Sequence, residues 1–130
     1  MNGRPALAAV VLAHLAVSLV HGTAHSGAQV ELDRAGMLFV YIVILLGPLA
    51  GLALSFWRPR AGAWIVALTM SGSLVFGLIN HFIIQGADHV SHVAPAWRTL
   101  FASTAALLVA VEAAGVAIGL RYAVRVRRAS

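Results

Sequence analysis

Six histidines stand out in a chain of 130 residues that carries only four carboxylates and no cysteine. Imidazole is the commonest metal ligand in proteins and suits Zn, Cu, Fe and Ni, and a carboxylate often completes such a site or orients a ligating imidazole. The absence of cysteine excludes disulfides, zinc fingers, thiolate iron–sulfur sites and thiol catalysis within this chain. The chemistry to be expected is therefore that of a histidine-rich metal site.

Two short motifs contain four of these histidines. In His-Gly-Thr-Ala-His, His21 and His25 are four residues apart and share one face if the segment is helical. In Asp-His-Val-Ser-His, His89 and His92 are three residues apart, and Asp88 precedes the first of them. Each motif is short enough to occur by chance, so its value depends on whether the fold brings the two together.

The elements that position these residues are membrane-spanning helices. Hydrophobic residues make up 61% of the chain and charged residues 10%, whereas soluble domains have about 45–50% and about 25%. A hydrocarbon core of about 30 Å requires roughly 20 apolar residues as helix. We predict an all-α integral membrane protein with a single domain, 1–130, folded as a four-transmembrane-helix bundle. The spans are about 5–21 (to 24 if the helix continues), 36–57, 62–84 and 99–120, and 121–130 is a basic cytoplasmic tail.

The arginines predict the orientation of these spans. Only Arg34 and Arg98 fall at the ends opposite the termini. The other seven lie at the ends that carry the termini: Arg4, Arg58, Arg60, Arg121, Arg125, Arg127 and Arg128. Because positive charge marks the cytoplasmic side, we expect both termini in the cytoplasm, in a bacterial inner membrane. The basic tail then meets anionic lipid headgroups, and we expect the lipid bilayer, not nucleic acid, as the partner.

The first apolar stretch has an alternative interpretation as a signal peptide. Arg4, the short apolar run and Ser26-Gly27-Ala28 resemble a charged start and a small-residue cleavage site. His14 interrupts the apolar run, however, which signal peptides rarely tolerate. We therefore expect the stretch to be the first membrane helix.

Two ionisable residues fall near the middle of the bilayer. At about 1.5 Å per residue, His14 and Glu112 each lie about nine residues from the inner end of their helices. Such residues are costly in a membrane and are usually functional. We predict a His14–Glu112 hydrogen bond, which either holds two helices together or acts behind the site as a second shell or proton relay.

The remaining histidines converge on the outer side. His81, preceded by Asn80, lies about one turn from the outer end of the third span, at the depth of His21. We therefore predict an outward-facing transition-metal site for Cu, Zn or Fe, used in metal handling or metal-dependent redox chemistry, with Asn80 in a supporting position. Its predicted ligands are His21, His25, His81, Asp88, His89 and His92.

Two alternatives remain open from the residues alone. His21 or His25 opposite His81 could ligate a haem b in an electron-transfer subunit, because two histidines on facing helices at one depth are what that cofactor needs. The chain could instead be a non-catalytic accessory subunit of a larger membrane complex, or a homo-oligomer. Small residues four apart, such as Gly47 and Gly51, allow close helix contacts of either kind. A transporter is the least favoured function.

Overall fold

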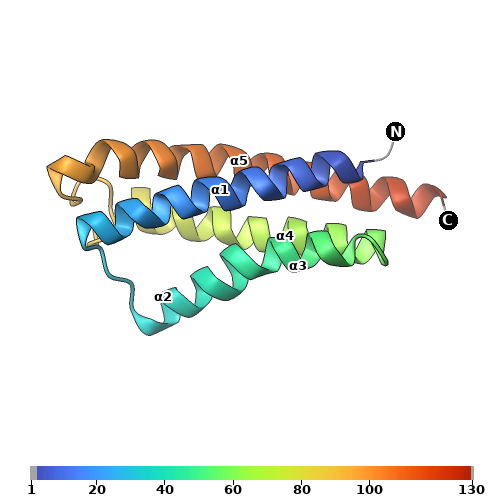
Figure 1. The fold of residues 1–130 in the computed structure, drawn as a ribbon, viewed down its shortest axis with the longest axis horizontal. Helices are drawn as coiled ribbons and strands as arrows, with labels where there is room; N and C mark the ends of the chain where they lie inside the picture. The colour runs from blue at the N-terminus through green and yellow to red at the C-terminus, as the bar shows by residue number, and fades with distance from the viewer. Residues whose placement is uncertain (1–2, 130) are drawn as a thin grey trace.

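The computed structural model describes residues 3–129, with side chains through 126, and this part of the chain is helical without strands. Figure 1 shows long, roughly antiparallel helices joined by short connectors. The elements are α1 (Arg4–Ala28), α2 (Arg34–Phe39), η1 (Val40–Leu46), α3 (Gly47–Leu54), α4 (Pro59–Leu78), η2 (Ile79–Ile83) and α5 (Pro95–Ala129).

Four helical stretches are long and apolar enough to span a membrane, in agreement with the predicted number. They cover Arg4–Ala28, Arg34–Leu54, Pro59–Ile83 and Pro95–Val126. The first and last are longer than predicted, because α1 continues past His21 to Ala28 and α5 begins before residue 99 and continues to Ala129. The predicted basic tail is therefore helical to Ala129, while the side chains of Arg127 and Arg128 lie outside the described part.

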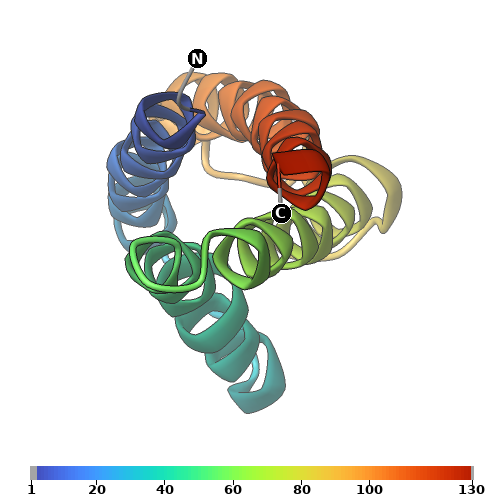
Figure 2. The ribbon, with the colours of Figure 1, turned by 90° about the vertical axis from the view of Figure 1, so that its right-hand side faces the viewer.

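The helices form a bundle that is closed on three sides. α5 packs against both α1 and α4, and α3 packs against α4, whereas α1 touches α3 much less. Seen end-on in Figure 2, α1, α5, α4 and α3 surround a centre, and α2 leans away from the bundle. Figure 1 shows α1 and α2 diverging toward the end that carries the 29–33 and 84–94 connectors, hereafter the connector end. The side between α1 and α2–η1 is consequently the open one.

Small residues create the close helix contacts on the closed sides. A Cβ built on Gly51 of α3 would lie 2.9 Å from the carbonyl oxygen of Gly62 on α4. A Cβ on Gly119 of α5 would lie 3.0 Å from the carbonyl oxygen of Ala63. The first distance is too short for a side chain, so glycine is required at position 51, and at position 119 a side chain would push α5 and α4 slightly apart. These small residues make contacts between helices of the same chain. Their spacing alone does not show whether they pack within the chain or against another subunit.

Two π-helical segments interrupt the spans. Pro48 has no N–H for the carbonyl of Ile44, and its ring would collide with that carbonyl in a regular helix. The turn before it widens into η1, and the Gly47 N–H bonds instead to Ile42. The second segment, η2, ends the third span and contains His81. Such segments occur often at functional sites, and both face the region where the histidines lie.

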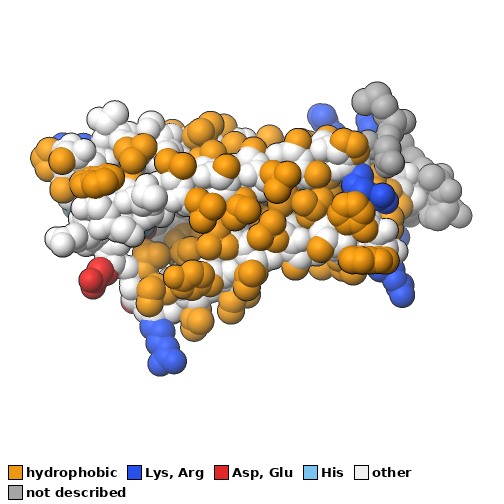
Figure 3. All heavy atoms as spheres, viewed as in Figure 1, with side chains coloured by type: hydrophobic (Ala, Val, Ile, Leu, Met, Phe, Trp, Pro, Cys, Tyr) orange, Lys and Arg blue, Asp and Glu red, His pale blue; other side chains and the backbone are white. Residues whose placement is uncertain are grey.

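Apolar side chains form both the core and the outer surface of the bundle. The main buried cluster lies toward the termini and includes Leu7, Val11, Val66 and Met70. Figure 3 shows hydrophobic side chains over the middle of the molecule and Arg side chains at its two ends. Such a distribution is typical of helices whose outward faces contact acyl chains and whose ends meet polar surroundings.

Candidate metal centre

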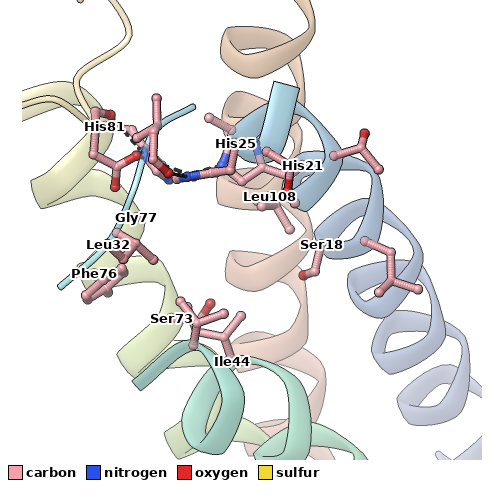
Figure 4. A pocket seen from close by; sticks show the side chains of 18 of the residues that line it. Ser18, His21, His25, Leu32, Ile44, Ser73, Phe76, Gly77, His81 and Leu108 are labelled. Atoms are coloured by element: carbon pink, nitrogen blue, oxygen red, sulfur yellow. Dashed lines mark hydrogen bonds and ion pairs between the residues drawn. The ribbon is translucent and has the colours of Figure 1, made fainter. Parts of the chain in front are cut away.

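Three buried or half-buried histidines meet near the connector end of the bundle. His21 and His25 lie one turn apart on α1, and His81 faces them from η2 (Figure 4). One ring nitrogen from each can be chosen so that all three lie within 4.8 Å of one another, a spacing compatible with one metal ion. Two nitrogens at a tetrahedral angle on a metal with bonds of about 2.1 Å are roughly 3.4 Å apart, so the widest pair would need to close by up to about 1.4 Å.

The protonation of His21 follows from its partner on α5. Its Nδ1 lies 2.8 Å from the Thr104 hydroxyl oxygen. That hydroxyl lies 2.6 Å from the Leu100 carbonyl oxygen, to which it donates its own proton. Thr104 must therefore accept from His21, so Nδ1 carries the hydrogen and Nε2 of the neutral ring carries the lone pair.

The other two rings are oriented in the same sense by backbone carbonyls, which can only accept. His81 Nδ1 lies 3.1 Å from the Asp88 carbonyl oxygen, and His25 Nδ1 lies 3.4 Å from that of Val30. In both rings the hydrogen is again on Nδ1. As neutral rings, all three histidines thus present an unprotonated Nε2, and a second group that fixes the tautomer in this way is the usual support of a metal-ligating histidine.

Two of these Nε2 atoms face groups that can only accept a hydrogen bond. Nε2 of His21 lies 3.2 Å from Nε2 of His81, and Nε2 of His25 lies 3.3 Å from Oδ1 of Asp88. Lone pairs that face each other at such distances repel unless a cation lies between them. Two ligands at a tetrahedral angle on a metal with bonds of about 2.0–2.1 Å are roughly 3.3 Å apart, so the observed separations match the edges of a coordination sphere.

Asp88 places an acidic oxygen beside His25 and His81. Its Oδ1 also lies 3.2 Å from Nδ1 of His81, and the side chain is almost completely buried. Neither carboxylate oxygen has a partner in acceptable hydrogen-bond geometry among the described residues, although Oδ1 is close to two imidazoles. A buried carboxylate with unmet acceptor capacity is costly, and a bound cation would remove that cost.

Phe101 closes the site on the α5 side. The centres of the His21, His25 and His81 rings lie 4.7, 4.8 and 5.1 Å from the centre of its ring. The three imidazoles are packed together against this fully buried phenyl group. The haem alternative gains no support from His21 and His81, because the 3.2 Å between their Nε2 atoms is shorter than the roughly 4 Å between two axial nitrogens on one iron.

Three other predicted site residues have partners of their own. His89 is buried in the connector, with Nδ1 2.7 Å from the Ser91 hydroxyl oxygen. His92 is exposed, and its Nδ1 bonds to the Gly86 carbonyl at 2.8 Å. Asn80 bonds to the Phe76 carbonyl of its own helix. The rings of His89 and His92 adjoin each other with centres 5.6 Å apart, but the three-histidine group with suitable spacing does not include them.

The predicted contact between His14 and Glu112 is present at mid-depth. Nε2 of His14 lies 3.2 Å from Oε1 of Glu112, and both side chains are buried. Ser73 of α4 donates a short hydrogen bond to the same carboxylate oxygen, so one carboxylate joins α1, α4 and α5. The Ser18 hydroxyl lies 3.5 Å from the His14 ring. This polar cluster is about 10 Å from His21 along α1, since seven residues separate His14 from His21.

A groove of about 1520 Å³ connects the two polar clusters. It follows the open side of the bundle between α1 and α2–η1, and its walls include His21, His25, His81, Asp88 and Glu112. Figure 4 shows the histidines above a space bordered by apolar side chains of α4, η1 and α5. The candidate metal centre is therefore reached from a cavity and is not sealed within the core.

Sequence reasoning missed the residues that orient the site, above all Thr104 and Phe101. A usable signal existed, because Phe101, Thr104, Leu108 and Glu112 recur at intervals of three, four and four and so share one face of α5. Because Glu112 is on that face, helix periodicity predicts that Phe101 and Thr104 point into the bundle with it. Comparison of the chain with protein-family models, with curated protein sequences and with solved structures finds no match.

Proposed function

We propose that this chain is an integral membrane protein that binds a transition metal ion through Nε2 of His21, His25 and His81 together with the Asp88 carboxylate. The observation that carries this proposal is the inward orientation of three Nε2 atoms, each Nδ1 lying within hydrogen-bond distance of a separate acceptor. A neutral, metal-free cluster would leave these lone pairs facing one another and Asp88.

The donor set restricts the metal. Three imidazole nitrogens and one carboxylate oxygen suit Zn, Cu or Fe, whereas Mg and Ca prefer all-oxygen sites. Four protein ligands close a structural zinc site, whereas a catalytic site keeps one position for water or substrate beside three protein ligands, so a molecule bound to the metal here would take the position of the Asp88 carboxylate. Because the groove reaches this cluster, we propose a metal centre that acts on, or exchanges metal with, a molecule in the groove.

We further propose that the centre lies at the outer face of a bacterial inner membrane. Most arginines lie at the end of the bundle that carries the termini, opposite the histidines, and this asymmetry favours a cytoplasmic location of that end. A metal supplied from the cell exterior or periplasm would then reach the site without crossing the membrane.

Elemental analysis of the purified protein tests the metal site. We expect close to one equivalent of Zn, Cu or Fe in the wild type, and its loss in His81→Ala. His92→Ala is the matched control, because His92 is an exposed histidine of the adjacent connector. Absence of a stoichiometric transition metal from the wild type, after growth with each metal supplied in turn, would overturn the proposal.

A further inference from the structure

We propose that the groove between α1 and α2–η1 is a binding site for a lipid-soluble molecule with an apolar chain and an uncharged hydroxyl or carbonyl head, which enters sideways from the bilayer. This inference goes beyond the metal site, because it concerns the open side of the bundle and the cluster around Glu112. The volume of the groove, about 1520 Å³, exceeds the roughly 300–1,000 Å³ of ordinary ligand pockets. The groove therefore has room for a molecule with an apolar chain.

The mouth of the groove lies at the depth of acyl chains. Met37, Tyr41 and Leu45 line it and follow the exposed Arg34 by three, seven and eleven residues. At about 1.5 Å per residue they lie roughly 5–17 Å from Arg34 toward the bilayer centre. On the opposite lip, Leu19 of α1 is 58% exposed. A molecule that enters between these lips comes from hydrocarbon and must be soluble there.

Two glycines leave space within the wall of the groove. A Cβ built on Gly22 of α1 meets no atom within 4 Å, and one built on Gly77 of α4 meets only Cδ2 of His81, at 3.8 Å. Both residues line the groove. Glycines elsewhere in the bundle, such as Gly51, are required by neighbouring backbone. Gly22 and Gly77 have no such neighbour, and the space that they leave is open to an occupant.

The polar groups in the groove select the head of that occupant. Ser73 and Glu112 are buried polar residues on its wall near mid-depth, and His21, His25 and Asp88 lie toward the connector end. An acyl chain alone cannot hydrogen-bond to any of them. The described residues that line the groove include no Lys or Arg, so beside Ser73 and Glu112, away from the histidine cluster, no side chain would neutralise a phosphate or carboxylate head. An uncharged hydroxyl or carbonyl can pair with these groups without bringing a buried charge.

Photolabelling in phosphatidylcholine vesicles tests the proposal. The probe is a medium-chain fatty alcohol with a diazirine near the end of its tail, and the cross-links are mapped by mass spectrometry. We expect labelling to concentrate on groove residues such as Ile44, Leu45 and Val109, and excess unlabelled alcohol to compete. Gly22→Leu and Gly77→Leu fill the groove and should lower this labelling about tenfold or more.

The glycine variants are suited to this test because a Cβ added at either position meets no clash, and because leucine favours helix over glycine. The matched control is Ala106→Leu, which adds the same bulk on an exposed face of α5 outside the groove and should label like the wild type. Metal content measured on each variant separates an effect on the groove from one on the histidines.

Three results would each overturn the inference. The first is labelling spread evenly over exposed lipid-facing residues such as Leu68 and unaffected by the glycine variants, which would mean ordinary boundary lipid. The second is equal labelling by the carboxylate-headed or trimethylammonium-headed analogue of the same chain. The third is labelling of the groove by a water-soluble diazirine in place of the fatty alcohol, which would mean a water-filled cleft.

Discussion

The Nε2 atoms of His21 and His81 face each other across 3.2 Å, although the residues are 60 positions apart and belong to the first and third spans. Each ring donates its Nδ1 hydrogen elsewhere, His21 to Thr104 and His81 to Asp88. A cation is therefore needed between the two nitrogens, and it is either a metal ion or an additional proton on one ring.

Chelation should destabilise the wild-type protein. A ligand that binds only the folded state at one hundred times its Kd adds about 2.7 kcal/mol of stability. We expect removal of metal by a chelator to lower the Tm in detergent, and restoration of the correct metal to recover it. His81→Ala should be insensitive to both treatments, whereas His92→Ala should respond like the wild type. An unchanged Tm on chelation would favour a proton, not a metal, between His21 and His81.

Thr104→Val should weaken metal binding without removing a ligand. Valine has nearly the shape of threonine but cannot accept the Nδ1 hydrogen of His21, so the tautomer with a free Nε2 loses its support. Loss of such a supporting group typically costs about 10–100-fold in metal affinity. Thr104→Ser keeps the hydroxyl and is the matched control. Competition with a chelator of known affinity measures the change, and equal affinity in the valine and serine variants would contradict the assigned role.

Glu112→Leu should destabilise the bundle and leave metal binding intact. The carboxylate accepts hydrogen bonds from Ser73 and pairs with His14. Leucine leaves those buried polar groups unpaired, at a cost of about 1–3 kcal/mol. Glu112→Gln keeps an acceptor oxygen and should lose less. Denaturation of the reconstituted protein measures the free energy of unfolding. If the leucine variant is as stable as the wild type, the cluster does not hold the helices together, and a proton-relay role gains weight.

The spans were predictable from the sequence, but their ends were not. Long apolar runs specify four helices because only helices satisfy the backbone in a membrane. Polar residues such as Thr23 and His25 did not end α1, since a polar side chain does not by itself break a helix. The end comes at Gln29, whose φ of 54° places it in the left-handed region. Pro95 gave an overlooked signal for the start of α5, because proline favours the first helical turn.

The candidate site was predictable where helix periodicity applied and not where a connector folds back. The shared face of His21 and His25 and the matching depth of His81 follow from regular helix geometry. Asp88 reaches the cluster because the Val90 N–H bonds to the His81 carbonyl at 3.0 Å, a contact that no local pattern specifies. In the same connector His89 bonds to Ser91. Side-chain direction in a connector depends on such tertiary contacts, so a ligand role for His89 and His92 stays a prediction.

The orientation of the protein can be tested with single cysteines, because the natural chain has none. Ala87 is exposed in the connector that carries Asp88, and Ala61 is exposed in the first turn of α4, at the end that carries the termini. A membrane-impermeant maleimide should label Ala87→Cys in cells with an intact inner membrane, and Ala61→Cys only after permeabilisation. The expected result follows from the excess of arginines at the Ala61 end. The reverse labelling pattern would place the histidine cluster on the cytoplasmic side, and its metal would then come from the cytoplasmic pool. Labelling of both positions in intact cells would contradict a fixed orientation across the membrane.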